Sequence, residues 1–186
     1  MWYRMSFYGH KLYSLIRQWE RERQLQRRFP TAVLEENVQI KSPHLLTLGE
    51  RVQIQKGTIL HCGGMPWSNG RGQITIGDDS VISPYCVLYG AGEIAIGARF
   101  DCGPGCMIFS SRSAFRETDM VLQSGGNHVF APVTIGDDVI LFAGCLISPG
   151  VNIGNGVVVG AGSVVLNDLP ANGVYAGVPA RPIDNH

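Results

Sequence analysis

An aliphatic residue returns at every sixth position along the C-terminal third of the chain, and this period constrains the fold more than any other feature. The series is Ile135, Leu141, Ile147, Ile153, Val159 and Val165. Neither the 3.6-residue period of an α-helix nor the two-residue period of a strand produces a strict repeat of six. Each hexad therefore forms one structural unit, a short strand plus a turn, which stacks on its neighbours in a solenoid.

The same phase recurs earlier in the chain, which supports a single architecture. Three further sets carry it, the first less regularly than the others: Leu48, Ile54 and Leu60; Ile76, Ile82 and Leu88; Ile96, Cys102 and Ile108. Three hexads make one coil with three flat faces, so the sequence predicts a mainly β triangular prism whose interior is filled by the periodic residues. Small or β-branched residues stand four positions after each of the first five periodic residues in the C-terminal series: Val139, Cys145, Val151, Val157 and Ser163. The 24 glycines of the 186 residues are explained as corners.

The first thirty residues form a separate basic element, because they hold seven Lys and Arg against two Glu, whereas the remainder holds eight against thirteen acidic residues. Apolar residues recur there at helical spacing, which predicts an amphipathic α-helix that ends at Pro30. We therefore expect an N-terminal helix over 1–30 and a solenoid domain over 31–186. Two roles stay open, a cap that packs on the first coil and a peripheral contact with an anionic membrane. The stripe is Tyr8, Leu12, Leu15, Ile16 and Trp19.

Composition limits the compartment and the partners. The chain has no apolar run near the roughly 20 residues that span a bilayer, and no signal peptide is visible. Its five cysteines fall mostly on interior positions and are predicted to be reduced packing residues. We expect a cytoplasmic protein, at the inner face of the membrane if the helix binds lipid. The net acidic solenoid disfavours nucleic acid.

Two segments interrupt the period, and function concentrates where a regular scaffold extrudes a loop. The first insertion covers 61–75 and the second covers 109–134. The second is the longer and contains Arg112 and His128. A loop of this length is expected to wall a cleft over a neighbouring coil or a neighbouring subunit.

Residues 133–183 resemble the C-terminal coils and tail of the hexapeptide-repeat acyltransferases. The most specific segments are GAGSVV (160–165) and AGVPARPI (176–183), and the maltose, galactoside and polysaccharide O-acetyltransferase branch is the most similar. The resemblance extends over roughly residues 48 to 183. It implies a left-handed parallel β-helix, a homotrimer, and an acetyl-CoA groove between adjacent prisms. The implied reaction is transfer of acetyl to a sugar hydroxyl. With the basic aromatic helix, it suggests a role in surface polysaccharide or lipopolysaccharide biosynthesis, and a free sugar or an amino-sugar nitrogen stays open as the acceptor.

The resemblance also assigns residues. Small residues at the corners, Ala143, Gly160 and Ala161, suit the pantetheine arm of acetyl-CoA, and the positions of the family motif that face CoA continue with Leu166, Asn167 and Arg181. Arg181 offers a charged fork for phosphate. Ser83 and Tyr85 occupy coil positions at which relatives present acceptor-binding side chains.

The general base is the main departure from the family pattern. The family histidine falls on Ser113, and a serine cannot remove the proton of an attacking hydroxyl as an imidazole does. We predict that His128 serves as the base, with Glu117 or Asp119 as candidates to orient it. His61 and Arg112, the one at the start of the first insertion and the other in the second, are candidates for contact with the acceptor.

Three alternatives remain beside direct transfer. A β-helix without catalysis would keep the trimer and act as a binding or assembly module. A zinc enzyme similar to the γ-class carbonic anhydrases is disfavoured, and no metal is expected, because His44 and His61 are the nearest pair of histidines in the sequence. A covalent cysteine intermediate is disfavoured for the core-like cysteines, and Cys62 is the one candidate for it.

Overall fold

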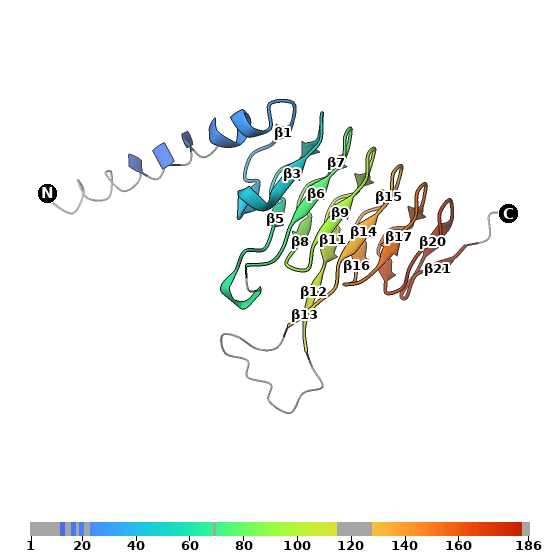
Figure 1. The fold of residues 1–186 in the computed structure, drawn as a ribbon. Coiled ribbons are helices and arrows are strands. Elements are labelled where there is room, and N and C mark those ends of the chain that lie inside the picture. The colour runs from blue at the N-terminus through green and yellow to red at the C-terminus, as the bar shows by residue number, and fades with distance from the viewer. Residues whose placement is uncertain are drawn as a thin grey trace, which may run out of the picture.

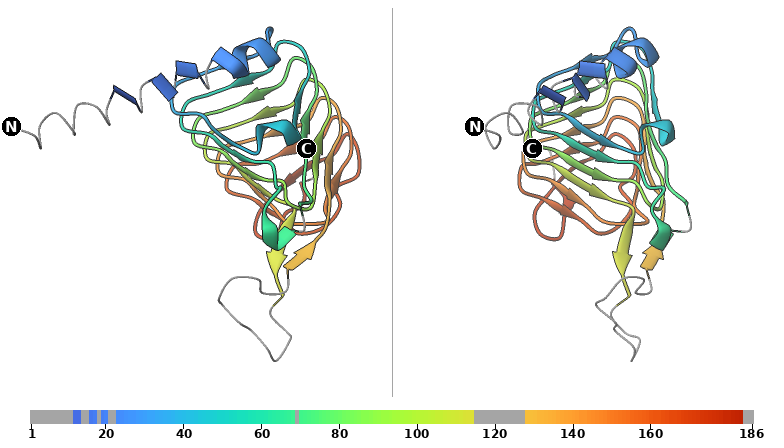
Figure 2. Two further views of the ribbon diagram at one scale, coloured as in Figure 1. Left: turned by 60° about the vertical axis from the view of Figure 1, so that its left-hand side comes forward. Right: turned by 90° about the vertical axis from the view of Figure 1, so that its left-hand side faces the viewer.

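The computed structural model describes residues 12–13, 16–17, 19–20, 23–68, 70–114 and 128–183. The chain winds around one axis, and the strands of successive coils lie side by side from the N-terminal to the C-terminal end (Figures 1 and 2). The strands pair in parallel from coil to coil and assemble into three sheets. The predicted mainly β solenoid of parallel strands is therefore confirmed.

We name the sheets A, B and C in the order in which each coil visits them. Sheet A contains β1 (Val33–Leu34), β4 (Gln53–Ile54), β7 (Val81–Ile82), β10 (Asp101–Cys102), β15 (Ile140–Leu141), β18 (Val158–Val159), β20 (Val174–Ala176) and β21 (Arg181–Pro182). Sheet B contains β2 (Gln39–Lys41), β5 (Ile59–His61), β8 (Val87–Tyr89), β11 (Met107–Phe109), β16 (Leu146–Ile147) and β19 (Val164–Val165). Sheet C contains β3 (Leu46–Leu48), β6 (Ile74–Ile76), β9 (Ile94–Ile96), β14 (Val133–Ile135) and β17 (Asn152–Ile153).

The remaining elements lie outside the three sheets. The short 3-10 helices η1 (Pro43–Leu45) and η2 (Pro66–Ser68) follow strands of sheet B. The strands β12 (Ser111–Ser113) and β13 (His128–Phe130) pair with each other as an antiparallel hairpin.

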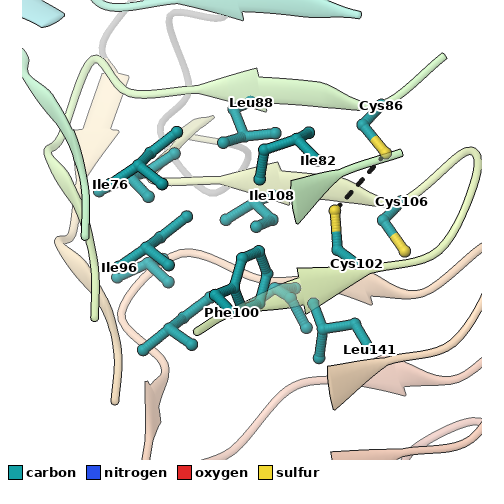
Figure 3. Close-up of a cluster of buried hydrophobic side chains, with 14 of the residues drawn as sticks. Ile76, Ile82, Cys86, Leu88, Ile96, Phe100, Cys102, Cys106, Ile108 and Leu141 are labelled. Atoms are coloured by element: carbon teal, nitrogen blue, oxygen red, sulfur yellow. Dashed lines mark hydrogen bonds between the residues drawn. The ribbon is translucent and has the colours of Figure 1, made fainter. Parts of the chain in front are cut away.

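The periodic residues form in-register ladders inside the prism, as their six-residue spacing predicts. In sheet A, Ile82 pairs with Cys102, and Cys102 pairs with Leu141. The ladders of the three sheets meet around Phe100, which is fully buried (Figure 3). Each fully buried side chain of this size contributes about 1.5–3 kcal/mol, so the stacked interior accounts for the main stabilisation of the solenoid.

The N-terminal segment does not pack as the capping hypothesis requires. The described residues between 12 and 28 are helical, but Leu12, Ile16 and Trp19 are 60%, 47% and 57% exposed. Phe29 and Ala32 are buried in the core at the first coil instead. These three residues of the stripe are therefore not covered, whereas Leu25, further along the same segment, packs against the core cluster. Tyr8 and Leu15 of the predicted stripe lie outside the described residues.

Both insertions leave the prism at one corner, between sheets B and C. The first runs from the end of β5 to the start of β6, and the second from the end of β11 to the start of β14. The coil that contains β8 and β9 lies between them. Two excursions far apart in sequence thus emerge side by side (Figure 1). The flanking strands extend slightly into the predicted insertion ranges 61–75 and 109–134, so the excursions themselves cover 62–73 and 110–132.

All five cysteines are buried and free, in agreement with their prediction as packing residues. Cys86 and Cys102 are in contact, with 3.6 Å between the two Sγ atoms (Figure 3). The cysteines lie in four successive coils, beginning with Cys62 at the end of β5 and ending with Cys145 before β16. Cys62, Cys86, Cys106 and Cys145 fill space inside corners of the prism, and Cys102 belongs to the inward ladder of sheet A.

Candidate functional site

The two insertions contact each other outside the prism through the side chain of Trp67. This residue lies in η2, and its ring centroid is 4.5 Å from that of His128 and 6.1 Å from that of Phe130. Figure 2 shows η2, in green, beside the two strands of the hairpin. All three side chains are partly exposed. The contact gives the imidazole of His128 a wall supplied by the other insertion.

His128 lies directly across the hairpin from Ser113. The two residues are partners in the antiparallel register of β12 and β13, and side chains of such partners stand on the same face of the pair, about 4.5–5.5 Å apart at Cβ. Ser113 is the position at which the family resemblance expects a histidine. The structure therefore brings an imidazole to the neighbourhood of that position from the opposite strand.

His61 is the second histidine at this corner, and it is buried. Its ring stacks on Tyr89, with centroids 4.5 Å apart and planes inclined by 19°. Its Nδ1 atom is buried and makes no hydrogen bond to any described residue. Burial, aided by the positive charge of Lys41, lowers the pKa of His61 below its ordinary value of 6.5. The side chain is thus held neutral against the wall of the prism.

An outward ladder on sheet B leads from this histidine along the corner. Lys41, His61, Tyr89 and Phe109 are successive partners in the parallel register of β2, β5, β8 and β11. Tyr89 and Phe109 have their ring centroids 6.1 Å apart. The ladder joins the start of the first insertion to the start of the second and forms the base on which both stand.

Gly92 lets the two ends of the second insertion lie close to the outward ladder of sheet B. A Cβ atom on Gly92 would overlap the carbonyl oxygen of Ser110 and approach the backbone nitrogen of Ala131 to 2.9 Å. Ser110 also receives a hydrogen bond at its Oγ from the amide of Gly92. Because Ser110 opens the insertion and Ala131 closes it, this glycine sets how closely the two ends approach.

The residues assigned to acetyl-CoA gather mainly at another corner, between sheets A and B. Ala143 and Ala161 occupy equivalent turns of successive coils, after β15 and β18, and both are exposed. The tail returns to the same corner, because Arg181 pairs with Ala176, and Ala176 Cβ lies against Gly160. The structure therefore brings together Ala143, Gly160, Ala161 and Arg181, which makes a low-relief surface with a guanidinium at one end.

Leu166 and Asn167 do not join this group. They follow β19 in sheet B, so they lie at the corner between sheets B and C, the corner of the insertions, and both are exposed. Ser83 and Tyr85 lie between β7 and β8 at the corner between sheets A and B. Tyr85 is 62% exposed. The candidate residues are thus divided between the two edges of sheet B.

Arg112 lies in β12 on the insertion side, one residue before Ser113, and is exposed. Glu117 and Asp119, the candidates to orient the base, lie outside the described residues. Arg112 and His128 are on facing strands of one hairpin, so the two candidates from the second insertion share one place in the fold.

The covalent role considered for Cys62 is not supported by its environment. The residue is fully buried, and burial raises the pKa of its thiol to about 12. A nucleophilic cysteine needs an accessible thiolate. Among the described residues, no three or more His, Cys, Asp or Glu are grouped so that they could hold a metal ion.

Trp67 is the site residue that the sequence reasoning missed. It lies within the first insertion, but no period relates that segment to the second insertion. The available signal was topological: both insertions follow the third aliphatic residue of a set, Leu60 in one case and Ile108 in the other. Equivalent places in two coils lie at the same corner, so contact between the two loops was foreseeable even though the residue was not.

The fold and the repeat of the C-terminal coils are similar to those of known hexapeptide-repeat transferases. Residues 132–167 match the protein family described as "Bacterial transferase hexapeptide (six repeats)". The resemblance to the hexapeptide-repeat acyltransferases, stated from the sequence, is thereby confirmed.

Particular relatives add detail. The chain is 47% identical over 62 residues to the galactoside O-acetyltransferase of Escherichia coli K12, which covers 33% of this chain and 30% of that protein. Among solved structures, it is similar to a variant of AntD, an N-acyltransferase from Bacillus cereus in complex with dTDP and coenzyme A. That likeness has a TM-score of 0.70 at 25% identity and covers 87% of each chain. A maltose O-acetyltransferase from Clostridium difficile 630 is similar with a TM-score of 0.55 at 27% identity, over 88% of this chain and 74% of that one.

The sequence matches are partial. The chain spans 55%, 46% and 30% of the lengths of three curated relatives from Saccharomyces cerevisiae, Schizosaccharomyces pombe and Escherichia coli. Within the part of the chain that the structure describes, no helix has the length and apolar character needed to cross a bilayer.

Proposed function

We propose that this protein is an acetyl-CoA-dependent acetyltransferase that acts on a sugar hydroxyl, in surface polysaccharide or lipopolysaccharide biosynthesis. The observation that carries the proposal is the cross-strand pair of Ser113 and His128. It supplies an imidazole beside the position where the family places its base. The crystallised neighbours with bound CoA support the choice of acyl donor.

Direct transfer is the mechanism that fits these residues. His128 accepts the proton of the acceptor hydroxyl while the hydroxyl oxygen forms a bond to the acetyl carbonyl carbon. The bond between that carbon and the CoA sulfur then breaks, and the thiolate that leaves takes up a proton to become free CoA. Backbone N–H groups stabilise the oxyanion. General-base help of this kind is worth about a hundredfold to ten-thousandfold in rate.

A homotrimer of left-handed prisms would complete the site. The outward face of sheet B carries an in-register apolar ladder of partly buried residues, whereas the outward face of sheet C is mostly polar. If sheet B faces a second copy, the corner that holds Ala143 and Arg181 in one protomer approaches the corner that holds His128 in the next. The ladder is Ile59, Val87, Met107, Leu146 and Val164.

The exposed apolar stripe of the N-terminal helix favours peripheral membrane contact over the capping role. Leu12, Ile16 and Trp19 are exposed beside the basic residues Arg17 and Arg23. An apolar stripe flanked by arginine suits an anionic leaflet. We propose that the helix holds the enzyme at the inner face of the membrane, close to a lipid-linked saccharide.

The first test measures acetyl-CoA binding and transfer separately. At a concentration about a hundred times its Kd, acetyl-CoA should stabilise the folded state by about 2.7 kcal/mol, seen as a rise in melting temperature. His128→Ala should keep this shift. With maltose, methyl β-galactopyranoside and glucosamine as acceptors, release of free CoA should fall by about a hundredfold or more in the variant.

The matched controls use the cross-strand partner. Ser113→Ala should retain full transfer. The single variant His128→Ser should lose transfer, and the double variant Ser113→His/His128→Ser should recover part of that rate, because it returns an imidazole to the same face of the hairpin. If glucosamine is the one acceptor of the three that is acetylated, the reaction is N-acetylation and the proposal of O-acetylation is wrong. Absence of any thermal shift would give first place to a binding or assembly module without catalysis.

A further inference from the structure

Trp67, Phe130 and His128 form a group of three rings at the corner where the insertions meet. The planes of Trp67 and Phe130 are inclined by only 10°, with centroids 6.1 Å apart. His128 lies 4.5 Å from Trp67 and 6.1 Å from Phe130. No single insertion supplies the group, because Trp67 comes from the first and the other two rings from the second. Because both insertions are needed to form this group, it points to a function that the two insertions share.

The three rings are neither buried in the core nor fully exposed. Each is partly accessible, and none of them belongs to the hydrophobic core cluster. Large aromatic rings bury 150–250 Å² when fully packed, and this burial dominates the energetics of a binding surface. Partly open aromatic side chains beside a proton acceptor have the composition of a ligand site, which combines apolar walls with a few convergent polar groups.

We infer that Trp67 and Phe130 form a stacking platform for a pyranose ring of the acceptor. One face of a pyranose presents C–H groups, which pack on the electron-rich face of an aromatic ring, while its hydroxyls point outward around the rim. A sugar on this platform would place rim hydroxyls beside His128. A nucleobase would fit the same rings but carries no ring hydroxyl for that imidazole to deprotonate.

The inference deepens the proposed acetyltransferase function and rests on it for the identity of the acceptor. It adds a binding residue, Trp67, to a site in which His128 holds the chemistry. Its position also explains why the first insertion exists at this corner: the segment carries the ring across the intervening coil to the hairpin. The low-relief surface of Ala143, Gly160, Ala161 and Arg181, assigned to acetyl-CoA, lies on the other edge of sheet B and does not include Trp67.

Intrinsic fluorescence tests the platform without turnover. The chain has three tryptophans, Trp2, Trp19 and Trp67, so a Trp2→Phe/Trp19→Phe variant leaves Trp67 as the sole tryptophan. Its emission should change on titration with maltose and with methyl β-galactopyranoside. Sorbitol, which has hydroxyls but no ring face, should leave the emission unchanged. No response to either pyranoside would overturn the inference, as would a response to dTDP alone or an equal response to sorbitol.

Kinetics and melting separate this inference from the proposed function. With a pyranoside acceptor, Trp67→Ala should raise the KM for the acceptor about tenfold, because it removes the aromatic face on which the sugar stacks. The KM for acetyl-CoA should stay unchanged. Equal changes in both KM values would contradict a saccharide-specific role. In the sole-tryptophan variant, thermal stabilisation by acetyl-CoA without a saccharide response would reject the platform alone. A saccharide response without that stabilisation would reject the transferase alone.

Discussion

His61 is a titratable group held where ionisation is costly. It is 3% exposed, its Nδ1 has no hydrogen-bond partner among the described residues, and Lys41 stands next to it on the ladder. Burial and the positive charge of Lys41 both disfavour the imidazolium form and lower the pKa of His61, and burial is the larger cause. The native protein therefore keeps this ring neutral at a pH at which the unfolded chain would protonate it.

The stability of the protein should consequently fall as the pH is lowered below about 6.5, the ordinary pKa of histidine. In that window the unfolded chain binds a proton that the native chain does not, so the free energy of unfolding decreases by at most about 1.4 kcal/mol for each pH unit. His61→Phe keeps the ring stacked on Tyr89 and should flatten this part of the profile, as measured by urea denaturation at several pH values.

The exposed His44 provides the matched control. His44→Phe should leave the decline with falling pH intact. An unchanged decline in His61→Phe would show that other groups cause it.

At the scale of elements, the corner of Gly92 determines how the second insertion joins the prism. Because an added Cβ overlaps Ser110, Gly92→Ala should cost about 1–3 kcal/mol through overpacking. It should also loosen the attachment of the insertion. Limited proteolysis should cut within residues 110–132 faster in this variant than in the wild type.

Gly105→Ala separates this local effect from a general loss of stability. Gly105 has φ of +71° and nothing within 4 Å of an added Cβ, so its substitution costs only about 1–2 kcal/mol of backbone strain. Cleavage of the insertion should stay at the wild-type rate. Equal acceleration in both variants would mean that overall destabilisation, and not the corner, controls the loop.

The elements differ in how far the sequence predicts them. The six-residue period specified the coils because one inward side chain per hexad is a physical requirement of the prism, and Ile82, Cys102 and Leu141 pair as that period demands. The pairing of Ser113 with His128 follows from the register of a hairpin whose strands carry no period. The ring contact between Trp67 and His128 depends on how two aperiodic segments fold toward each other. The sequence therefore allowed His128 to be predicted as the candidate base in the second insertion. It did not allow its contacts with Ser113 and Trp67 to be predicted.

At the scale of the whole molecule, the outward face of sheet B is the face that we propose for assembly. Met107 lies in the middle of its apolar ladder, between Val87 and Leu146. Met107→Glu would place a charge in the centre of the proposed interface, where burial of an unpaired carboxylate is costly. The variant should dissociate to monomers in multi-angle light scattering and lose transfer activity, although its isolated prism should still fold.

Ala95→Glu is the corresponding control on sheet C, where Ala95 faces outward and is exposed. It should remain trimeric and active. A trimeric Met107→Glu protein would place the subunit interface on a different face.

The five buried cysteines allow the order in which the coils open to be measured by chemical labelling. Cys62, Cys86, Cys102, Cys106 and Cys145 occupy four successive coils, and each coil of a solenoid is held chiefly by its immediate neighbours. A thiol becomes open to alkylation only when its own coil separates. The sequence in which the five thiols acquire an alkyl label during unfolding therefore records which end of the prism unravels first, without any introduced probe.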